Sequence, residues 1–181
     1  MTVQVYQTLE DRNNPQDIAT NGPFKCSRSD AWLGDGYYFW ENYIEHAHWW
    51  GLKGCKNNYV ICSAQYDNNQ YYCFDLIDNY DHLFFLEEIY IIVKTKTRKP
   101  VLVPKLIELL KKEISFDFDA IRAPSLEAIS DPLVIKYKSD NRAKIFLRPL
   151  NQICFFQKKN RLNLRDFRIV FPPHYVEGYV V

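Results

Sequence analysis

The sequence predicts an α+β fold, because strand-like and helix-like runs follow one another without the regular alternation of a doubly wound parallel sheet. Hydrophobic residues make up 47% of the 181 residues and charged residues 25%, which are ordinary values for a globular chain. Neither a G-x-G-x-x-G turn nor a Walker loop is present, so the dinucleotide-binding and P-loop folds are not indicated. The length suits one domain that covers residues 1–181.

The chain opens with a strand, a short helix and a second strand. VQVYQTL at 3–9 is rich in β-forming residues, and PQDIATNG at 15–22 predicts a short helix that Gly22 stops. GYYFWE at 36–41 follows a Gly-Asp-Gly turn and predicts the second strand.

A helix is expected directly after this second strand. Asn42 is a plausible N-cap, and Tyr43, Ala47 and Trp50 recur at helical spacing up to Gly51. The stretch from the Gly-Asp-Gly turn to this helix is crowded with aromatic side chains, which suit either a core or a pocket for a flat ring.

The middle of the chain predicts a hairpin and two further elements. NNYVICSAQYD at 57–67 and QYYCFDLID at 70–78 are strand-like and are joined by an Asn-Asn turn. LEEIYIIVKT at 86–95 favours a strand by its β-branched residues but also suits the opening of a helix. PKLIELLKKEI at 104–114 is the clearest helix. Four strands complete the prediction, at 118–123, 143–149, 151–157 and 164–171.

The formal net charge of +1 gives no global sign of a nucleic-acid or membrane partner. Two local basic runs are present, and such runs are usually solvated faces, with contact to a polyanion as the alternative. They comprise Lys94, Lys96, Arg98 and Lys99, and Lys158, Lys159, Arg161, Arg165 and Arg168. No run approaches the ~20 apolar residues of a membrane span, so no membrane partner is expected.

The cysteines indicate a reduced compartment. The five of them show no C-x-x-C pair, which argues against a disulfide framework and against a zinc site. His46 and His48 do not share a helix face, so no metal is expected there either. The opening residues lack the pattern of a signal peptide. We therefore expect a cytoplasmic protein without a metal.

Three segments together resemble the ADP-ribosyltransferase fold, in the branch of diphtheria toxin and the poly(ADP-ribose) polymerases. They are VYQT at 5–8, GDGYYFW at 34–40 and NQICFF at 151–156, in the order of the family's three motifs. The resemblance covers most of residues 3–165, and the middle motif is its most specific part. It implies split antiparallel β-sheets with flanking helices, and NAD⁺ as co-substrate.

The resemblance also implies a set of site residues. Tyr38 and Gln152 stand at catalytic positions, and Tyr38 would stack on the nicotinamide ring with Trp49 on the other side. The remaining contacts to NAD⁺ would come from Gln7, Thr8, Gly36 and His46. The alternative for His46 is an exposed helix histidine. Most other aromatics of the stretch, namely Tyr37, Phe39, Trp40 and Tyr43, are expected in the core or at its flank.

Two of the three motif positions depart from the family. Gln7 replaces a His or Arg that binds ribose, and Gln152 replaces the catalytic Glu, so the hydrogen bond is kept and the charge is lost. Family members without that Glu are generally mono-transferases or inactive. Another acid would have to supply the charge, and the candidates are Glu10, Asp11, Asp35, Glu87 and Glu88.

The expected function is therefore NAD-dependent mono-ADP-ribosyl transfer, in the manner of a small toxin or effector. The acceptor would be a protein or a nucleic acid (RNA or DNA), and a neutralising antitoxin or immunity protein is an implied partner. The first alternative is an inactive module that binds NAD⁺, ADP-ribose or a partner protein. The second is a structural protein whose aromatics only fill a core.

Overall fold

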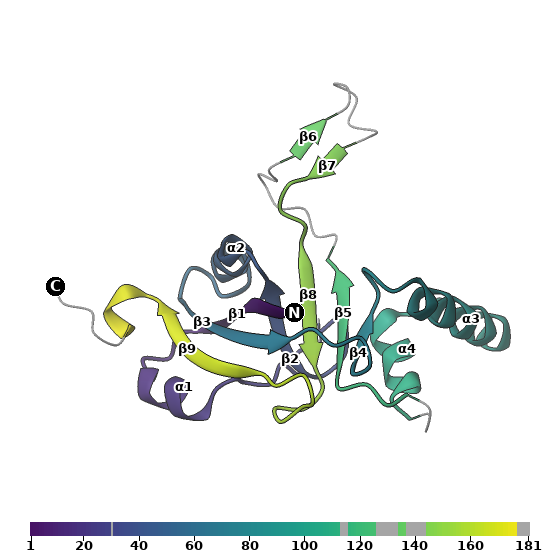
Figure 1. The fold of residues 1–181 in the computed structure, drawn as a ribbon, viewed down its shortest axis with the longest axis horizontal. Helices are drawn as coiled ribbons and strands as arrows, with labels where there is room; N and C mark the ends of the chain where they lie inside the picture. The colour runs from purple at the N-terminus through teal and green to yellow at the C-terminus, as the bar shows by residue number, and fades with distance from the viewer. Residues whose placement is uncertain (30, 113–115, 126–133, 137–143, 177–181) are drawn as a thin grey trace.

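The computed structural model describes residues 1–29, 31–112, 116–125, 134–136 and 144–176, and it has a mixed α+β architecture (Figure 1). Its main element is a seven-stranded sheet of order β4-β5-β8-β2-β1-β3-β9, antiparallel except between β4 and β5. These strands are β1 (Thr2–Glu10), β2 (Tyr37–Glu41), β3 (Tyr59–Asp67), β4 (Cys73–Asp75), β5 (Ala120–Pro124), β8 (Asn151–Phe155) and β9 (Arg165–Phe171). A separate antiparallel pair contains β6 (Val134–Lys136) and β7 (Lys144–Phe146).

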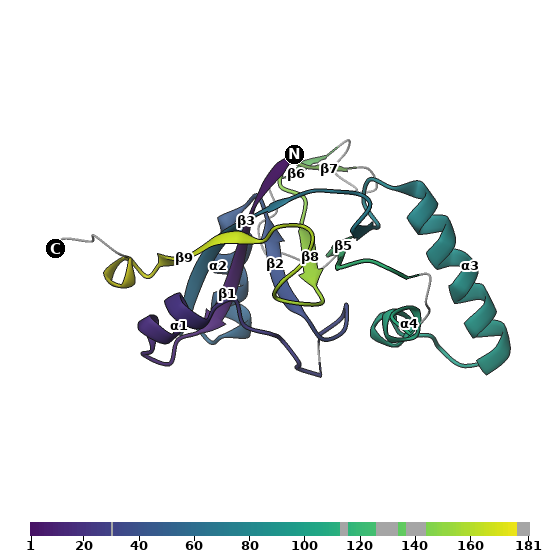
Figure 2. The same ribbon diagram turned by 60° about the horizontal axis from the view of Figure 1, so that its bottom comes forward.

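Helices lie at both ends of the sheet in the described part of the chain. They are α1 (Pro15–Asn21), α2 (Ile44–Gly54), α3 (Tyr80–Thr97), α4 (Val103–Leu110) and the short 3-10 helix η1 (Pro173–Tyr175). Figures 1 and 2 show α3 and α4 at one end of the molecule and α1 and η1 at the other. Proline stands at the start of both α1 and α4, where its missing N–H costs no helical hydrogen bond.

Two helices cover opposite faces of β3. Ile61 packs with Ala47 of α2, whereas its neighbours Val60 and Cys62 pack with Ile18 of α1. Successive side chains of a strand point to opposite faces, so this alternation follows directly from the sequence VIC.

Helix α4 covers the face of the sheet that α2 covers, but at the other end. Ile107 of α4 packs with Ile121 and Cys154. Cys154 is the cross-strand partner of both Ile121 and Tyr38, and Tyr38 lies on the same face of β2 as Trp40, which packs under α2. The part of this face over β2 and β8 therefore lies between two helical covers.

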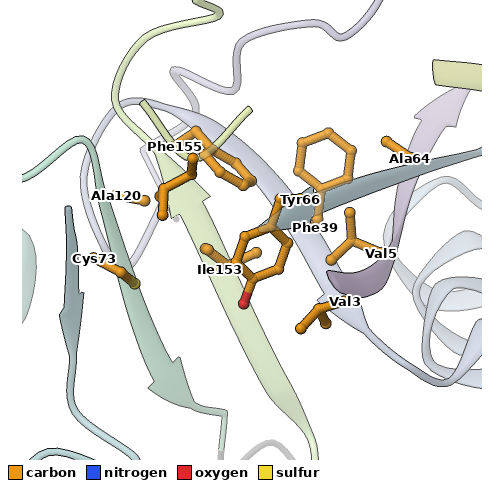
Figure 3. Packing of buried hydrophobic residues seen from close by; sticks show 10 residues of the cluster. Val3, Val5, Phe39, Ala64, Tyr66, Cys73, Ala120, Ile153 and Phe155 are labelled. Carbon is orange, nitrogen blue, oxygen red and sulfur yellow. The ribbon is translucent and has the colours of Figure 1, made fainter. Parts of the chain in front are cut away.

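The opposite face of the central strands is closed by an apolar cluster (Figure 3). The rings of Phe39 and Phe155 meet edge to face with centroids 5.7 Å apart, and Tyr66 meets Phe155 at 5.5 Å. Val5 and Ile153 are fully buried beside them. These contacts fix β2 between β1 and β8 and so position the residues on its other face.

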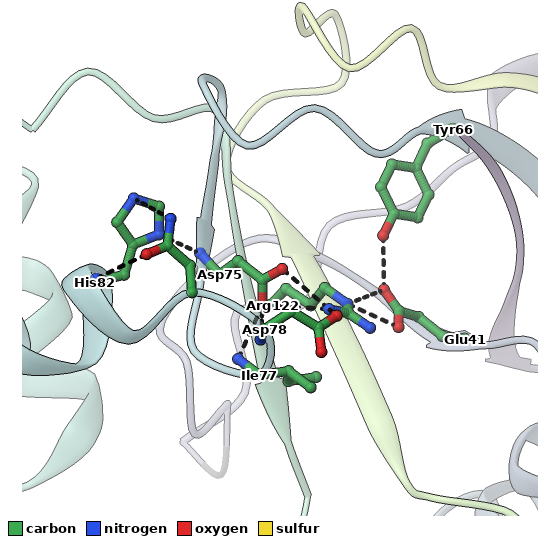
Figure 4. A network of polar contacts seen from close by, with 8 residues as sticks. Glu41, Tyr66, Asp75, Ile77, Asp78, His82 and Arg122 are labelled. Carbon is green, nitrogen blue, oxygen red and sulfur yellow. Dashed lines mark hydrogen bonds and ion pairs between the residues drawn. The ribbon is translucent and has the colours of Figure 1, made fainter.

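A buried polar network ties four strands together next to this cluster (Figure 4). Glu41 is 1% exposed and accepts hydrogen bonds from Tyr66 Oη at 2.6 Å and from Arg122 Nε at 2.9 Å. Arg122 also donates from Nη1 to Asp75 at 3.0 Å and to Asp78. A buried carboxylate is tolerated only when it is paired and hydrogen-bonded, and Glu41 meets both conditions.

The structure corrects several expected elements. Strand β4 is only Cys73–Asp75 and pairs in parallel with β5, so the expected hairpin of 57–67 with 70–78 is wrong. Residues 86–95 belong to helix α3 and not to a strand. Asn42 has φ of 62° and precedes the N-cap Tyr43, so it does not cap α2.

The predicted ends of two elements fall partly outside the described residues. Helix α4 ends at Leu110, and positions 113 and 114 of the predicted helix lie outside the described residues, as does position 143 of a predicted strand. The other predicted strands and helices are present within a few residues of their expected bounds.

Candidate functional site

The candidate site begins where β1 and β2 separate. Their ladder ends at the pair Tyr6–Trp40, although β1 continues beside β3 and β2 continues beside β8. Gln7, which follows Tyr6 on β1, and Tyr38, two residues from Trp40 on β2, therefore lie at a fork in the sheet.

A pocket with a volume of about 630 Å³ opens at this fork. Its size falls in the ordinary range of sites for small organic ligands. The described residues of its wall include aromatic, cationic and acidic side chains. The aromatics are Phe24, Trp32, Tyr38, Trp40 and Trp50, the cations are Arg12, Lys25, Arg28 and Lys56, and the acids are Glu10 and Asp17.

The three motif positions of the sequence meet in this one pocket. Gln7 comes from β1, Tyr38 from β2 and Gln152 from β8, and each lines the wall. Thr8 lines it as well, and its Oγ1 donates to the carbonyl of Ala47 at 2.8 Å, which ties β1 to α2.

The hydroxyl of Tyr38 is held by the turn that precedes its strand. It accepts a hydrogen bond from the Leu33 N–H at 2.8 Å and donates to the Gly34 carbonyl at 2.6 Å. Burial raises the pKa of Tyr38 well above its usual value, so the phenol stays protonated at neutral pH. The hydroxyl thus fixes the ring in place and is not a general base.

The two glycines of the Gly-Asp-Gly turn have different roles. Gly34 has φ of +81°, a conformation that favours glycine. Gly36 is needed for close approach, because a Cβ there would lie 2.3 Å from Cys154 Sγ and 2.7 Å from the Phe155 carbonyl oxygen. Gly36 also exchanges two backbone hydrogen bonds with Cys26, which brings that segment to the pocket wall.

The side-chain amide of Gln152 is oriented by Trp32. The indole Nε1–H of Trp32 donates to Gln152 Oε1 at 2.7 Å, and an indole can only donate. This contact assigns the oxygen to Trp32 and leaves the amide Nε2, which no acceptor among the described residues bonds, on the pocket side. Gln152 therefore offers a ligand a donor, where a glutamate would offer an acceptor.

Gln7 makes its hydrogen bonds within the protein. Its Nε2 donates to the Phe24 carbonyl at 2.9 Å, and its Oε1 accepts from the Phe24 N–H at 3.0 Å. The side chain is 4% exposed and also approaches the Tyr38 carbonyl, with Nε2 and O 3.5 Å apart. Gln7 thus keeps the 24–26 segment against the fork and leaves little hydrogen-bonding capacity for a ligand.

The tryptophan of α2 that lines the pocket is Trp50 and not Trp49. Trp49 packs edge to face on Trp40, with centroids 6.0 Å apart, and has the Lys53 ammonium 5.0 Å from its ring. The Trp50 ring lies over Gly54, where a Cβ would come within 2.6 Å of it. The pocket wall therefore contains the ring of Trp50 and not the ring of Trp49.

His46 lies away from the described pocket wall. It is 2% exposed and sits beside the rings of Tyr43 and Trp40, with centroids 5.4 and 5.8 Å away. Burial lowers its pKa, and its Nδ1 has no hydrogen-bond partner among the described residues. Its surroundings are those of a neutral core histidine and not of an exposed one.

Among the described residues of the wall, cations outnumber acids. Glu10 is paired with Arg12 at 3.1 Å, and its side chain is 60% exposed. Asp35 faces Lys25 at 3.7 Å but does not line the pocket. Among the other acids considered, Asp11 lies outside the wall and Glu87 and Glu88 lie on α3 at the far end of the molecule. The wall therefore favours an anionic ligand.

One acceptor in the wall has no partner. Asn14 donates from Nδ2 to Asp17 at 3.0 Å, but its Oδ1 is buried and accepts no hydrogen bond from the described residues. This oxygen has almost no accessible surface although the pocket is open, so it is not presented to a ligand.

Sequence reasoning missed Trp32, Trp50 and the pocket cations. Trp32 stands two residues before Gly34 in a segment without regular structure, so no periodicity marks it. Arg28 lies 5.7 Å from the centroid of the Trp50 ring, a contact between a loop and a helix that only the folded chain brings about.

No family model, no curated protein and no solved structure matches the chain. Among the described residues, no group of three or more His, Cys, Asp or Glu side chains is arranged to hold a metal ion.

Proposed function

We propose that the chain is an NAD⁺-dependent mono-ADP-ribosyltransferase of the fold that its motifs resemble. The observation that carries the proposal is the meeting of Gln7, Tyr38 and Gln152 in one pocket at a fork of the sheet. The three residues stand on the neighbouring strands β1, β2 and β8, in the order in which the family's motifs occur, and all of them line one pocket.

The wall suits the parts of a dinucleotide. Tyr38 and Trp50 are ring-shaped side chains on which a planar nicotinamide would stack. Lys25, Arg28 and Lys56 would neutralise a pyrophosphate.

The proposed reaction replaces one bond at the ribose. The bond between the anomeric carbon and the nicotinamide nitrogen breaks, and its electron pair leaves with nicotinamide. A nucleophilic oxygen or nitrogen of the acceptor forms the new bond and releases its proton to water. In this scheme Tyr38 holds the ring in place, and Gln152 Nε2 donates to a ribose oxygen.

A second candidate function is a module that binds NAD⁺ or ADP-ribose without transferring it. The orientation of Gln152 favours this alternative, because the positive end of the amide faces the pocket and stabilises no cationic transition state. Both candidates share the ligand and differ in whether nicotinamide is released.

One experiment separates the two candidates. The protein is incubated with NAD⁺ labelled in its adenine part and with cell lysate, and nicotinamide release, label transfer and ADP-ribose binding by calorimetry are measured. Transfer that protease or nuclease treatment removes identifies the acceptor as protein or nucleic acid. Binding without release supports the module, and no binding at millimolar ligand contradicts both.

Variants of Tyr38 and Gln152 sharpen the result. Tyr38→Ala should abolish binding, and Tyr38→Phe, which keeps the ring, should retain most of it. In Gln152→Glu one oxygen would still accept from Trp32 and the other would face the pocket as an acceptor, so release should rise about tenfold or more. An unchanged rate would mean that Gln152 does not occupy the carboxylate position.

The implied setting of a toxin or effector, with an antitoxin or immunity protein as partner, rests on the motif resemblance alone. Capture of such a partner with the purified chain would test it separately from the enzyme assay.

A further inference from the structure

The end of α3 and the start of α4 form a basic segment without a single acid. Between Glu88 and Glu108 the sequence contains no Asp or Glu. The cations of this segment are Lys94, Lys96, Arg98, Lys99 and Lys105. Of these, Lys105 is paired with Glu108 at 2.8 Å, whereas no carboxylate of the described residues pairs with the other four.

The same segment exposes large aliphatic side chains. Leu102 is 67% exposed, Ile91 52%, Ile92 47% and Val103 43%. Helix α3 packs against the sheet cluster through Phe85, Leu86 and Ile89, and Ile91 lies on the side of the helix away from Ile89, whereas Leu102 and Val103 stand at the start of α4. Residues 90–103 are called the α3–α4 corner below.

The corner also contains an open hollow. Tyr90, Lys94, Thr95, Arg98, Lys99 and Pro100 line it together. Lys94 rests over the Tyr90 ring at 5.3 Å, and Arg98, in the left-handed conformation, ends the helix. Three cations therefore line one hollow, in the same segment as the exposed aliphatic side chains.

The corner lies at the end of the molecule that is remote from the candidate pocket. Figures 1 and 2 show α3 and α4 at one end, whereas α1 and α2, which flank the pocket, lie toward the other. The corner is thus free to meet a second surface while the pocket is occupied.

We propose that the α3–α4 corner docks on an anionic lipid bilayer. Cations beside exposed aliphatic groups match an anionic leaflet, which offers headgroup phosphates and, just below them, hydrocarbon. A nucleic acid offers the phosphates but no hydrocarbon layer for the exposed side chains of Leu102 and Ile91. No described helix is long and apolar enough to cross a membrane, and docking of this peripheral kind requires none.

The test is co-sedimentation of the full chain with vesicles. The protein should sediment with phosphatidylcholine vesicles that contain phosphatidylglycerol, should stay in solution with pure phosphatidylcholine, and should be released by high salt. The variant K94Q/R98Q/K99Q should bind about a hundredfold more weakly, since each cation near an anionic leaflet contributes about fivefold. Leu102→Ser, at a site too exposed to disturb folding, should weaken binding severalfold without any change of charge.

A matched variant serves as control. K158Q/K159Q/R168Q removes the same charge from the other basic run and should retain binding. An equal loss of vesicle binding in the two triple variants would overturn the proposal, because binding would then depend on the net charge of the protein and not on the α3–α4 corner. Unchanged binding of Leu102→Ser, or binding of single-stranded RNA through the same cations with no vesicle binding, would overturn it as well.

Discussion

Two glutamines determine which hydrogen bonds the candidate pocket offers a ligand. Both hydrogen-bonding atoms of Gln7 are engaged by the main chain of Phe24, and the oxygen of Gln152 is engaged by Trp32. The Nε2 of Gln152 has no acceptor among the described residues and remains as a donor. Of these two side chains, Gln152 is therefore the one suited to bind a ligand that presents a hydrogen-bond acceptor.

At the residue scale, we expect alanine substitutions of the two glycines in the Gly-Asp-Gly turn to lower stability by different amounts. Gly36→Ala should lower the free energy of unfolding by about 3 kcal/mol, because the new methyl would meet Cys154 Sγ and a backbone oxygen that cannot move without breaking the β2–β8 ladder. Gly34→Ala should lower the free energy of unfolding by only about 1–2 kcal/mol. No atom of the described residues lies close to the position of the new methyl group, so only the left-handed backbone is strained. Urea unfolding measures both.

A double variant checks the cause. Cys154→Ala in the Gly36→Ala background should recover only part of the loss, because the contact of 2.7 Å with the Phe155 oxygen remains. Full recovery, or a larger effect of Gly34→Ala, would contradict this account of the turn.

The sequence predicted three pocket residues on strands, but it missed Trp32 on a loop and Trp50 on a helix, and it placed Trp40, which lines the pocket from β2, in the core or at its flank. The sequence was sufficient to predict Gln7, Tyr38 and Gln152, because each lies within a recognisable strand motif. Trp32 was not, since its position depends on a hydrogen bond to a residue 120 positions later. Trp50 lines the pocket in place of Trp49 because of the way in which helix α2 is rotated about its axis. The tertiary contacts of this helix, which starts at Ile44, determine that rotation.

At the scale of elements, local sequence patterns were sufficient to predict most helices and strands, except where pairing between distant segments determined the structure. The strands at β1, β2, β8 and β9 and the helices α1, α2 and α4 follow from periodicity and from their proline and glycine boundaries. β4 did not, because its partner is β5, more than forty residues away, and not its neighbour β3. Residues 86–95 became helical because Asn79 caps a helix that starts well before them.

The attachment of α3 to the sheet should depend on pH through His82. Its Nδ1 accepts a hydrogen bond from the Asp75 N–H at 2.9 Å (Figure 4), which requires the neutral ring. Burial lowers the pKa of His82, and the nearby Asp75 and Asp81 oppose this only in part. The unfolded chain therefore takes up a proton first as the pH falls below about 6.5, and the stability contributed by this contact is lost below that pH.

Hydrogen exchange measures this effect. Exchange in residues 80–97, corrected for the intrinsic rate, should become severalfold faster between neutral pH and pH about 5.5 relative to the central strands. In His82→Asn the Oδ1 takes the place of Nδ1 and cannot be protonated, so the pH dependence should disappear. If the pH dependence persisted in His82→Asn, another titrating group would be responsible for the effect.

At the scale of the whole molecule, two separate helices pack on one face of the sheet. α2 and α4 pack at opposite ends of the same face, and the candidate pocket opens over β2 between them, at the fork with β1. The buried network of Glu41, Arg122 and Asp75 fastens the strands on which both covers rest. Such a sheet is a rigid support, so the pocket and the α3–α4 corner should act as independent sites.

Independence can be measured as a coupling between two ligands. The affinity for vesicles containing phosphatidylglycerol should be the same with and without saturating ADP-ribose, and linkage then requires that vesicles leave the affinity for ADP-ribose unchanged. Correspondingly, K94Q/R98Q/K99Q should bind ADP-ribose like the unmodified chain, and Tyr38→Ala should bind vesicles like it. A change of about tenfold or more in either affinity would show that the sheet transmits a conformational difference. Hydrogen exchange with each ligand in turn would then locate that difference in the strands that join the two sites.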